Sequence, residues 1–144
     1  MSLNRWESMG YIVHHLARLF AGELAHSLQQ HGVAIGQYPL LLALWEEDGL
    51  SQTELSRRLG IEPATTTNTL HRMERDGLVA RQPDPGDRRG SRVHLTDRGR
   101  ELEEPITAAA RAVNARALKN LSAGEAAELK HMLGKVVRGL EAEE

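Results

Sequence analysis

Four stretches of the chain repeat apolar residues every three or four positions, the spacing that places them on one face of an α-helix. These stretches cover residues 4–31, 37–47, 97–117 and 122–140. In the first stretch the apolar face consists of Ile12, Leu16, Leu19, Phe20, Leu24 and Leu28, and we expect it to serve association as well as the core. In the last stretch it consists of Leu129, Leu133, Val136, Val137 and Leu140, and we expect it to point inward.

Between these stretches, the pattern predicts two short helices joined by a turn. Ser51 and Glu54 have the spacing of a capping box, in which each side chain bonds the backbone N–H of the other. Gly60 supplies a left-handed residue that ends the first helix, and Pro63 suits the first turn of the second, which Gly77 ends. Two helices joined by so short a connection are typical of a helix-turn-helix.

The second of these helices has one apolar and one polar face. Ile61, Thr66 or Thr67, Leu70 and Met73 share the first, and Thr65, Asn68, Thr69, Arg72 and Arg75 point away from it. The polar face suits a DNA major groove, because short polar side chains can approach base edges and arginine can pair with guanine or phosphate. The alternative is the ordinary polar face of a soluble amphipathic helix.

Two strands are expected next. Residues 78–81 can begin a strand, and residues 91–95 alternate between apolar and polar positions. The residues between them, 83–90, are rich in Pro, Gly and Asp, which favour turns. Pro105, further along, lies inside the third helical stretch and should bend or loosen a turn there.

The expected hairpin carries Arg88 and Arg89 at its tip. A hairpin with cations at its tip, directly after a candidate recognition helix, is typical of a wing, and arginines there could enter the minor groove of A·T-rich DNA. The alternative is a solvated loop in which Asp84 and Asp87 pair with these arginines.

Two parts of the sequence resemble the MarR family of winged-helix regulators. DPGDRR at 84–89, followed by VHLTDRG at 93–99, is similar to the family's wing, and residues 51–60 and 70–79 are similar to its helix-turn-helix. The resemblance covers essentially the whole chain. It implies a dimeric DNA-binding protein, most often a repressor, of a kind that small molecules often release from DNA. Where many members carry arginine in the recognition helix, this chain has Asn68, which pairs naturally with adenine, so the operator should differ.

The candidate DNA-binding residues are Ser51, Thr53, Thr65, Thr66, Asn68, Thr69, Arg72, Arg88, Arg89 and Arg92. Those on the second helix should meet the major groove, and Ser51 and Thr53 should lie near phosphates. Arg89 is the first candidate for the minor groove, and Arg88 should pair with Asp87 or phosphate, the reverse assignment being the alternative. Arg92 should approach the DNA backbone. A two-fold dimer would place its recognition helices about 34–36 Å apart, which predicts a pseudo-palindromic site on double-stranded DNA.

The charge distribution favours DNA binding by the middle of the chain. The formal net charge is −2, but residues 51–100 carry ten Arg and seven acidic residues, a balance of +3, against −5 elsewhere. Positive charge is therefore concentrated where DNA would lie.

The fold class we expect is mainly α with a small β-hairpin wing. In one compact domain, residues 35–96 would form the winged helix-turn-helix, and residues 1–34 and 97–144 a helical dimerisation region. The flanking helices have more apolar surface than so small a winged unit needs, which favours a homodimer. The alternative is a monomeric helical cap.

Other functions find little support in the sequence. The 144 residues contain no cysteine, no apolar run of eighteen residues and no signal-peptide pattern, which favours a cytoplasmic protein without a membrane segment. The seven histidines show no i, i+4 pair, so we expect no metal site, although a site assembled across helices, as in some zinc-sensing relatives, is the alternative. Without catalytic motifs we expect neither an enzyme nor a cofactor.

An effector site is the last expectation. The resemblance implies that small aromatic acids lodge between the winged unit and the dimerisation helices, where His15, Tyr38 and Trp45 could form a pocket. The alternative is that Tyr38 and Trp45 fill the core. The other functions left open are a winged-helix protein-interaction module and a ligand-binding module without its own operator.

Overall fold

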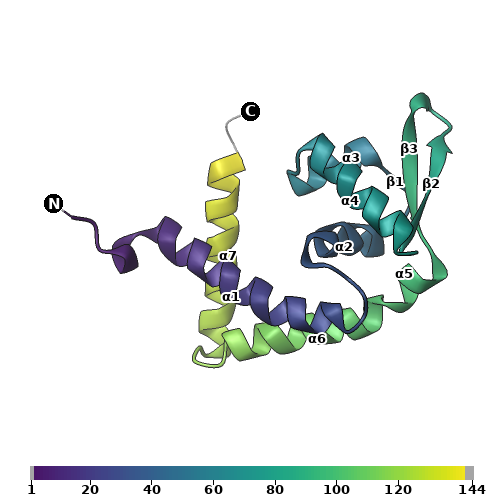
Figure 1. Ribbon diagram of the computed structural model, residues 1–144. Helices are drawn as coiled ribbons and strands as arrows, with labels where there is room; N and C mark the ends of the chain where they lie inside the picture. Colours follow the sequence, from purple (N-terminus) through teal and green to yellow (C-terminus); the bar gives the residue numbers. More distant parts are fainter. Residues whose placement is uncertain (1, 142–144) are drawn as a thin grey trace. The chain divides into compact units, whose positions relative to one another are not determined.

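Helices dominate the computed structural model, which describes residues 2–141 apart from the side chains of residues 87–89 (Figure 1). The first half contains η1 (Arg5–Glu7), α1 (Met9–Gln29), η2 (Ile35–Gln37), α2 (Tyr38–Glu46), β1 (Leu50–Ser51), α3 (Gln52–Leu59) and α4 (Pro63–Arg75). The second contains β2 (Val79–Asp84), β3 (Asp87–Leu95), α5 (Asp97–Glu101), α6 (Glu103–Ala117) and α7 (Ala123–Glu141). The expected fold class, mainly helical with a small hairpin, is confirmed. The chain divides into two compact units, Met1–Ala109 and Ala110–Glu144.

The N-terminal helical stretch is interrupted near its start, so the expectation of one helix from residue 4 is wrong there. The side chain of Asn4 accepts a hydrogen bond from the backbone N–H of Trp6, which begins the short η1. Ser8 then accepts one from the N–H of Tyr11 and begins α1. Two capping residues so close together start two separate helices, since each satisfies N–H groups that a continuous helix would use internally.

The helix-turn-helix forms where the sequence predicts it. The Ser51 hydroxyl accepts from the N–H of Glu54 at 3.0 Å and caps α3. Gly60 ends that helix with φ of 62°, in the left-handed region that favours glycine. The reciprocal half of the expected capping box is absent from the described contacts of Glu54, because its carboxylate instead accepts hydrogen bonds from Arg57 and Arg58.

The core of the first unit joins these helices to the sheet. Its fully buried side chains include Leu28, Leu40, Leu41, Leu44, Leu55, Leu70, Met73, Leu78, Val93 and Ile106. Leu70 and Met73 belong to the apolar face predicted for α4. Their burial holds α4 against the core and leaves its opposite face to solvent.

The sheet is antiparallel with the strand order β1-β3-β2. Strand β2 continues to Asp84 and β3 begins at Asp87, so the predicted turn over residues 83–90 is much shorter, with Pro85 and Gly86 at its tip. Pro83 fits because β2 is an edge strand, where a missing N–H removes no ladder bond. Strand β1 pairs Leu50 with Val93 and was not predicted, because two residues are too few for a sequence pattern. Figure 1 shows the β2–β3 hairpin extending beyond α4.

The expected loosened turn near Pro105 is found. The stretch from residue 97 forms two helices, α5 and α6, which separate at Leu102. A proline ring clashes with the carbonyl four residues earlier, which is that of Glu101, so the helix breaks before Pro105 and resumes with the proline in its first turn.

Several apolar side chains that we expected to point inward are exposed. On α7, Leu133, Val136, Val137 and Leu140 are between 37 and 84% exposed. On α1, where the apolar face was expected to serve association as well as the core, Leu16 and Leu19 are also exposed. A helix face of this kind is stable in water only when something covers it. Within residues 2–141, none of the helices combines the length and apolarity needed to cross a membrane.

Candidate nucleic-acid interface

The outer face of α4 presents polar side chains to solvent. Thr65, Asn68 and Arg72 are all exposed and lie three or four residues apart, so they share one side of the helix. Among the described residues, Arg72 makes no ion pair. Its guanidinium is therefore free to donate to guanine or phosphate, as the sequence predicts for this position.

Two threonines predicted to contact DNA face the other way. Thr66 is 1% exposed and lies on the apolar face, where the sequence placed either Thr66 or Thr67. Thr69 is 8% exposed, so the expectation that it lies on the outer face is wrong. Thr66 accepts a hydrogen bond from the Ser56 hydroxyl at 2.9 Å and packs against α3. A threonine is small and amphipathic, so the residue type alone does not show whether it lies on the buried or the exposed face of a helix.

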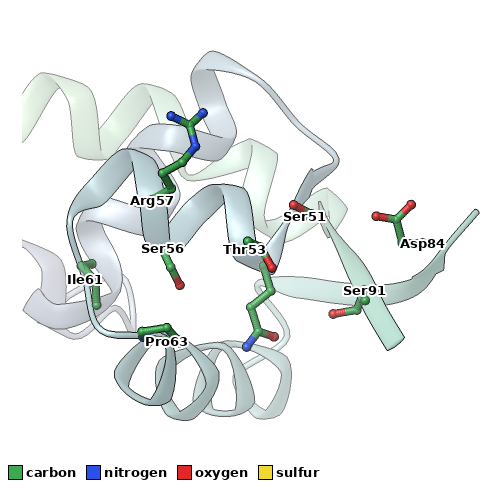
Figure 2. Close-up of a pocket in the computed structure, with 10 residues that line it drawn as sticks. Ser51, Thr53, Ser56, Arg57, Ile61, Pro63, Asp84 and Ser91 are labelled. Atoms are coloured by element: carbon green, nitrogen blue, oxygen red, sulfur yellow. The ribbon is translucent and has the colours of Figure 1, made fainter. Parts of the chain in front are cut away.

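A groove of about 690 Å³ lies between the helix-turn-helix and the hairpin (Figure 2). It is lined by Ser51, Gln52, Thr53, Ser56, Arg57, Ile61, Pro63, Asp84, Gly90 and Ser91. The predicted phosphate contacts Ser51 and Thr53 both line it, and Thr53 is exposed. The groove offers hydroxyl groups and the Arg57 guanidinium to a phosphate backbone, and the carboxylate in its lining, that of Asp84, is paired with Arg92.

The two arginines in the last turn of α3 are partly paired with acidic side chains. Arg57 and Arg58 both donate to the carboxylate of Glu54, and these hydrogen bonds hold the pKa of Glu54 below its ordinary value. Arg58 also pairs with Glu47 at 2.7 Å. The Arg57 side chain remains 70% exposed, so it can exchange its carboxylate partner for a phosphate at little cost.

Asp84 stabilises the hairpin tip. Its carboxylate accepts from the N–H of Gly86 at 2.9 Å and from Arg92 at 3.4 Å, and these bonds lower the pKa of Asp84. Arg92, a predicted contact to the DNA backbone, is half-exposed and also donates to the carbonyl of Gly49. The side chains of Arg88 and Arg89 lie outside the described residues, so their roles at the tip stay predictions.

Arg81 connects the hairpin to the helix-turn-helix, a role that the sequence did not single out. It extends from β2 and bonds Gln52 on α3 and both His71 and Glu74 on α4. Its side chain is only 18% exposed. Strand alternation places Arg81 on the same face as the buried Val79, opposite Val93 of β3, but nothing in that pattern shows that two helices converge on it.

The three residues predicted to form an effector pocket lie in different environments. His15 stacks on Tyr11 with their ring centroids 5.8 Å apart. Trp45 packs against the core and donates its indole N–H to the carbonyl of Gly99 at 2.9 Å. Tyr38 also packs against the core, where burial raises the pKa of its hydroxyl. These contacts favour a packing role for Tyr38 and Trp45, and the pocket stays a prediction.

Two packed helices, an exposed polar second helix and a projecting hairpin with a polar groove between them define a winged helix-turn-helix. Comparisons with known proteins agree. The MarR family model matches residues 34–91. The transcriptional repressor Rv2887 of Mycobacterium tuberculosis is 31% identical over 128 residues, which cover 89% of this chain and 92% of that protein. The repressor MdtR of Bacillus subtilis is 30% identical over 122 residues, 85% of this chain and 79% of MdtR. The chain belongs to the MarR family.

Solved structures show the same fold. A MarR transcriptional regulator from Methanosarcina mazei superposes with a TM-score of 0.88 at 29% identity, covering 93% of this chain and 97% of that one. A mutant MarR from E. coli in complex with operator DNA superposes with a TM-score of 0.83 at 27% identity, covering 89% of this chain and 92% of that one. PcaV from Streptomyces coelicolor in complex with its natural ligand superposes with a TM-score of 0.85 at 25% identity, covering 95% of this chain and 96% of that one.

Proposed function

We propose that this protein is a cytoplasmic, homodimeric transcriptional repressor that binds a pseudo-palindromic operator on double-stranded DNA. The observation that carries the proposal is the exposed face of α4, with Thr65, Asn68 and Arg72, beside the groove that separates the helices from the hairpin. The helix would enter the major groove, and the groove residues and the hairpin would hold the flanking backbone. The E. coli relative bound to operator DNA supports the assignment.

A homodimer follows from the exposed apolar faces of α1 and α7. Met9, Val13, Leu16 and Leu19 are exposed on α1, and five large apolar side chains are exposed on α7. Such faces mark a protein–protein contact, and a second copy of the chain supplies a complementary face by two-fold symmetry. The same symmetry doubles the DNA interface, which supports a two-fold operator.

A small aromatic effector is the second part of the proposal. PcaV, a relative of similar structure, was crystallised with a natural ligand. A thermal-shift screen with aromatic acids tests this part directly. Ligands that raise the unfolding temperature and also release the protein from DNA support it, and a screen without any shift opposes it.

The decisive experiment measures sequence-specific binding. Fluorescence anisotropy of the purified protein on labelled DNA flanking its own gene, repeated at several salt concentrations with random DNA as competitor, gives the affinity, the salt slope and the specificity ratio. We expect competitor-resistant binding about a thousandfold or more tighter than to random DNA, with a steep negative salt slope. Binding to random DNA and to sequences selected from the genome with equal affinity would contradict the proposal. A protein partner bound without salt dependence would favour an interaction module instead.

A further inference from the structure

Arg81 joins the hairpin to both helices of the helix-turn-helix. Its Nη1 donates to Oε1 of Gln52 on α3 at 3.0 Å, and its Nη2 lies 2.8 Å from Nδ1 of His71 on α4. Its Nε donates to the carboxylate of Glu74, one turn further along α4. A guanidinium has donors and no acceptor, so this contact is a hydrogen bond in the His71 tautomer whose Nδ1 is the acceptor.

The hydrogen bonds continue from Gln52 to the beginning of α4. Because Arg81 occupies the Gln52 carbonyl oxygen, the Gln52 amide nitrogen faces Thr67 and donates to its hydroxyl. The Thr67 hydroxyl donates in turn to the carbonyl of Pro63 at 2.9 Å. The guanidinium therefore sets the direction of every bond in a chain that runs from β2 through α3 to the first turn of α4.

We propose that Arg81, Gln52 and Thr67, which we call the Arg81 strut, set the position of α4 against α3 and the hairpin and thereby support base discrimination. The inference rests on the proposed DNA-binding function and concerns the same interface. Arg81 is a positioning residue, and it acts through the α4 side chains that meet the bases.

Burial separates this role from a direct contact with DNA. The Arg81 side chain is 18% exposed and bonds three protein side chains, whereas the side chain of Arg57, which also lines the groove, is 70% exposed. A guanidinium with three protein partners has few donors left for a phosphate. Arg57 is therefore suited to a direct contact with phosphate, and Arg81 to holding the helices and the hairpin in position.

The two roles have different consequences for binding. Hydrogen bonds to base edges lose strength when donor and acceptor are misaligned, whereas contacts of a cation with phosphate tolerate small shifts. Loosening α4 should therefore lower the preference for operator over mismatched DNA. It should leave the affinity for random DNA and the salt slope unchanged.

The test compares conservative substitutions that keep or remove one bond of the strut. Arg81→Lys keeps the charge but cannot reach three partners from a single nitrogen, and Thr67→Val keeps the shape but removes the hydroxyl. We expect each to lower the ratio of operator to mismatch affinity by about tenfold. Thr67→Ser keeps the hydroxyl and should retain the full ratio. Arg111→Lys, an exposed arginine of α6, is the matched control and should change nothing.

Thermal unfolding of each variant, together with anisotropy on operator, single-mismatch and random DNA, distinguishes the outcomes. A lower ratio in a folded Thr67→Val protein, with Thr67→Ser at the wild-type ratio, supports the strut even where Arg81→Lys is unstable. Discrimination at the wild-type level in both Arg81→Lys and Thr67→Val overturns the strut and leaves the proposed function intact. An equal loss of affinity on all DNA with a shallower salt slope also overturns it, in favour of a phosphate contact by Arg81. If the wild-type protein binds operator DNA no more tightly than mismatched or random DNA, both the proposed function and the role of the Arg81 strut are overturned.

Discussion

Ser56 and Thr66 face each other across the turn of the helix-turn-helix, with the Ser56 hydroxyl donating to Thr66 Oγ1 at 2.9 Å. Both residues are buried, and Thr66 Oγ1 also lies 3.3 Å from the carbonyl of Glu62, to which it donates. The pair connects α3 to the first turn of α4 through a fully satisfied polar contact. Thr66 is therefore a structural residue of the motif, although its position in the sequence suggested a contact with DNA.

Replacing Thr66 with valine should destabilise the protein rather than alter its DNA preference. The substitution keeps the shape but leaves the buried Ser56 hydroxyl without its acceptor, which costs about 1–3 kcal/mol. The double variant Ser56→Ala, Thr66→Val removes both partners and should recover part of that loss. Urea unfolding of the three proteins measures the effect. A fully stable Thr66→Val protein with altered operator preference would return Thr66 to the DNA interface.

Gly99 should tolerate no side chain. A Cβ at this position would lie against the backbone carbonyl of Leu78, which cannot rotate away, and 3.1 Å from the Leu95 side chain. We expect Gly99→Ala to lower the free energy of unfolding by about 1–3 kcal/mol, as overpacking does.

The matched control is Gly22→Ala in α1, where nothing lies within 4 Å of the added methyl group. Alanine is the better helix former, so the control should stabilise the protein by about 0.5–1 kcal/mol. A lower unfolding temperature for Gly99→Ala together with a higher one for Gly22→Ala would confirm the prediction. Equal changes in the two variants would contradict it.

Asn68 and Arg89 should affect DNA binding in different ways. Asn68→Ala removes a side chain suited to adenine, so it should relax the sequence preference by about 1–3 kcal/mol at one base pair. Arg89→Ala should weaken binding to all sequences and reduce the salt slope by about one. Anisotropy on operator variants at several salt concentrations separates the two patterns. Unchanged discrimination in Asn68→Ala would show that Asn68 does not read a base.

Asp76 should make stability dependent on pH in the acid range. Its carboxylate accepts a hydrogen bond from the Gln37 amide at 3.0 Å and pairs with Arg75, and these contacts lower the pKa of Asp76 below its ordinary 3.8. A lowered pKa means that the ionised form is favoured by folding. The stabilisation is therefore complete above the ordinary value and is lost as the pH falls through the lowered one.

Asp76→Asn keeps an acceptor for Gln37 and removes the charge. The stability advantage of the wild type over this variant should be constant near neutral pH and should shrink below about pH 4. Urea midpoints between pH 3 and pH 7 measure it. Parallel curves for the two proteins over that range would contradict the prediction.

Val136 tests the proposed dimer. It is 45% exposed on the apolar face of α7, where a charge would be buried against the second copy. Val136→Glu should weaken association by about 30-fold or more, as expected of a residue central to an interface. Sedimentation at several protein concentrations measures the change. Lys135→Glu adds the same carboxylate to the neighbouring, polar position and should leave the dimer intact.

Local patterns were sufficient to predict the helix-turn-helix and its boundaries. Ser51, Gly60, Pro63 and Gly77 act on their own backbone within a few residues, so their positions in the chain mark where α3 and α4 begin and end. The MarR family followed from the same region, because the wing and helix motifs are continuous in sequence. The helix break near Pro105 was predictable for the same reason, because the proline ring acts on the backbone of its own turn.

Contacts between distant residues required the tertiary structure. The burial of Thr66 and Thr69, the β1–β3 pairing and the three partners of Arg81 each depend on elements that meet only after folding. Helical periodicity shows that one face of α7 is apolar. The same periodicity would be found whether that face packs within its own chain or against a second copy of the chain. Sequence therefore determined which elements form and which family they belong to, because capping and periodicity act locally. Only the folded chain decided which polar residues are left for DNA, because burial is a property of the whole packing arrangement.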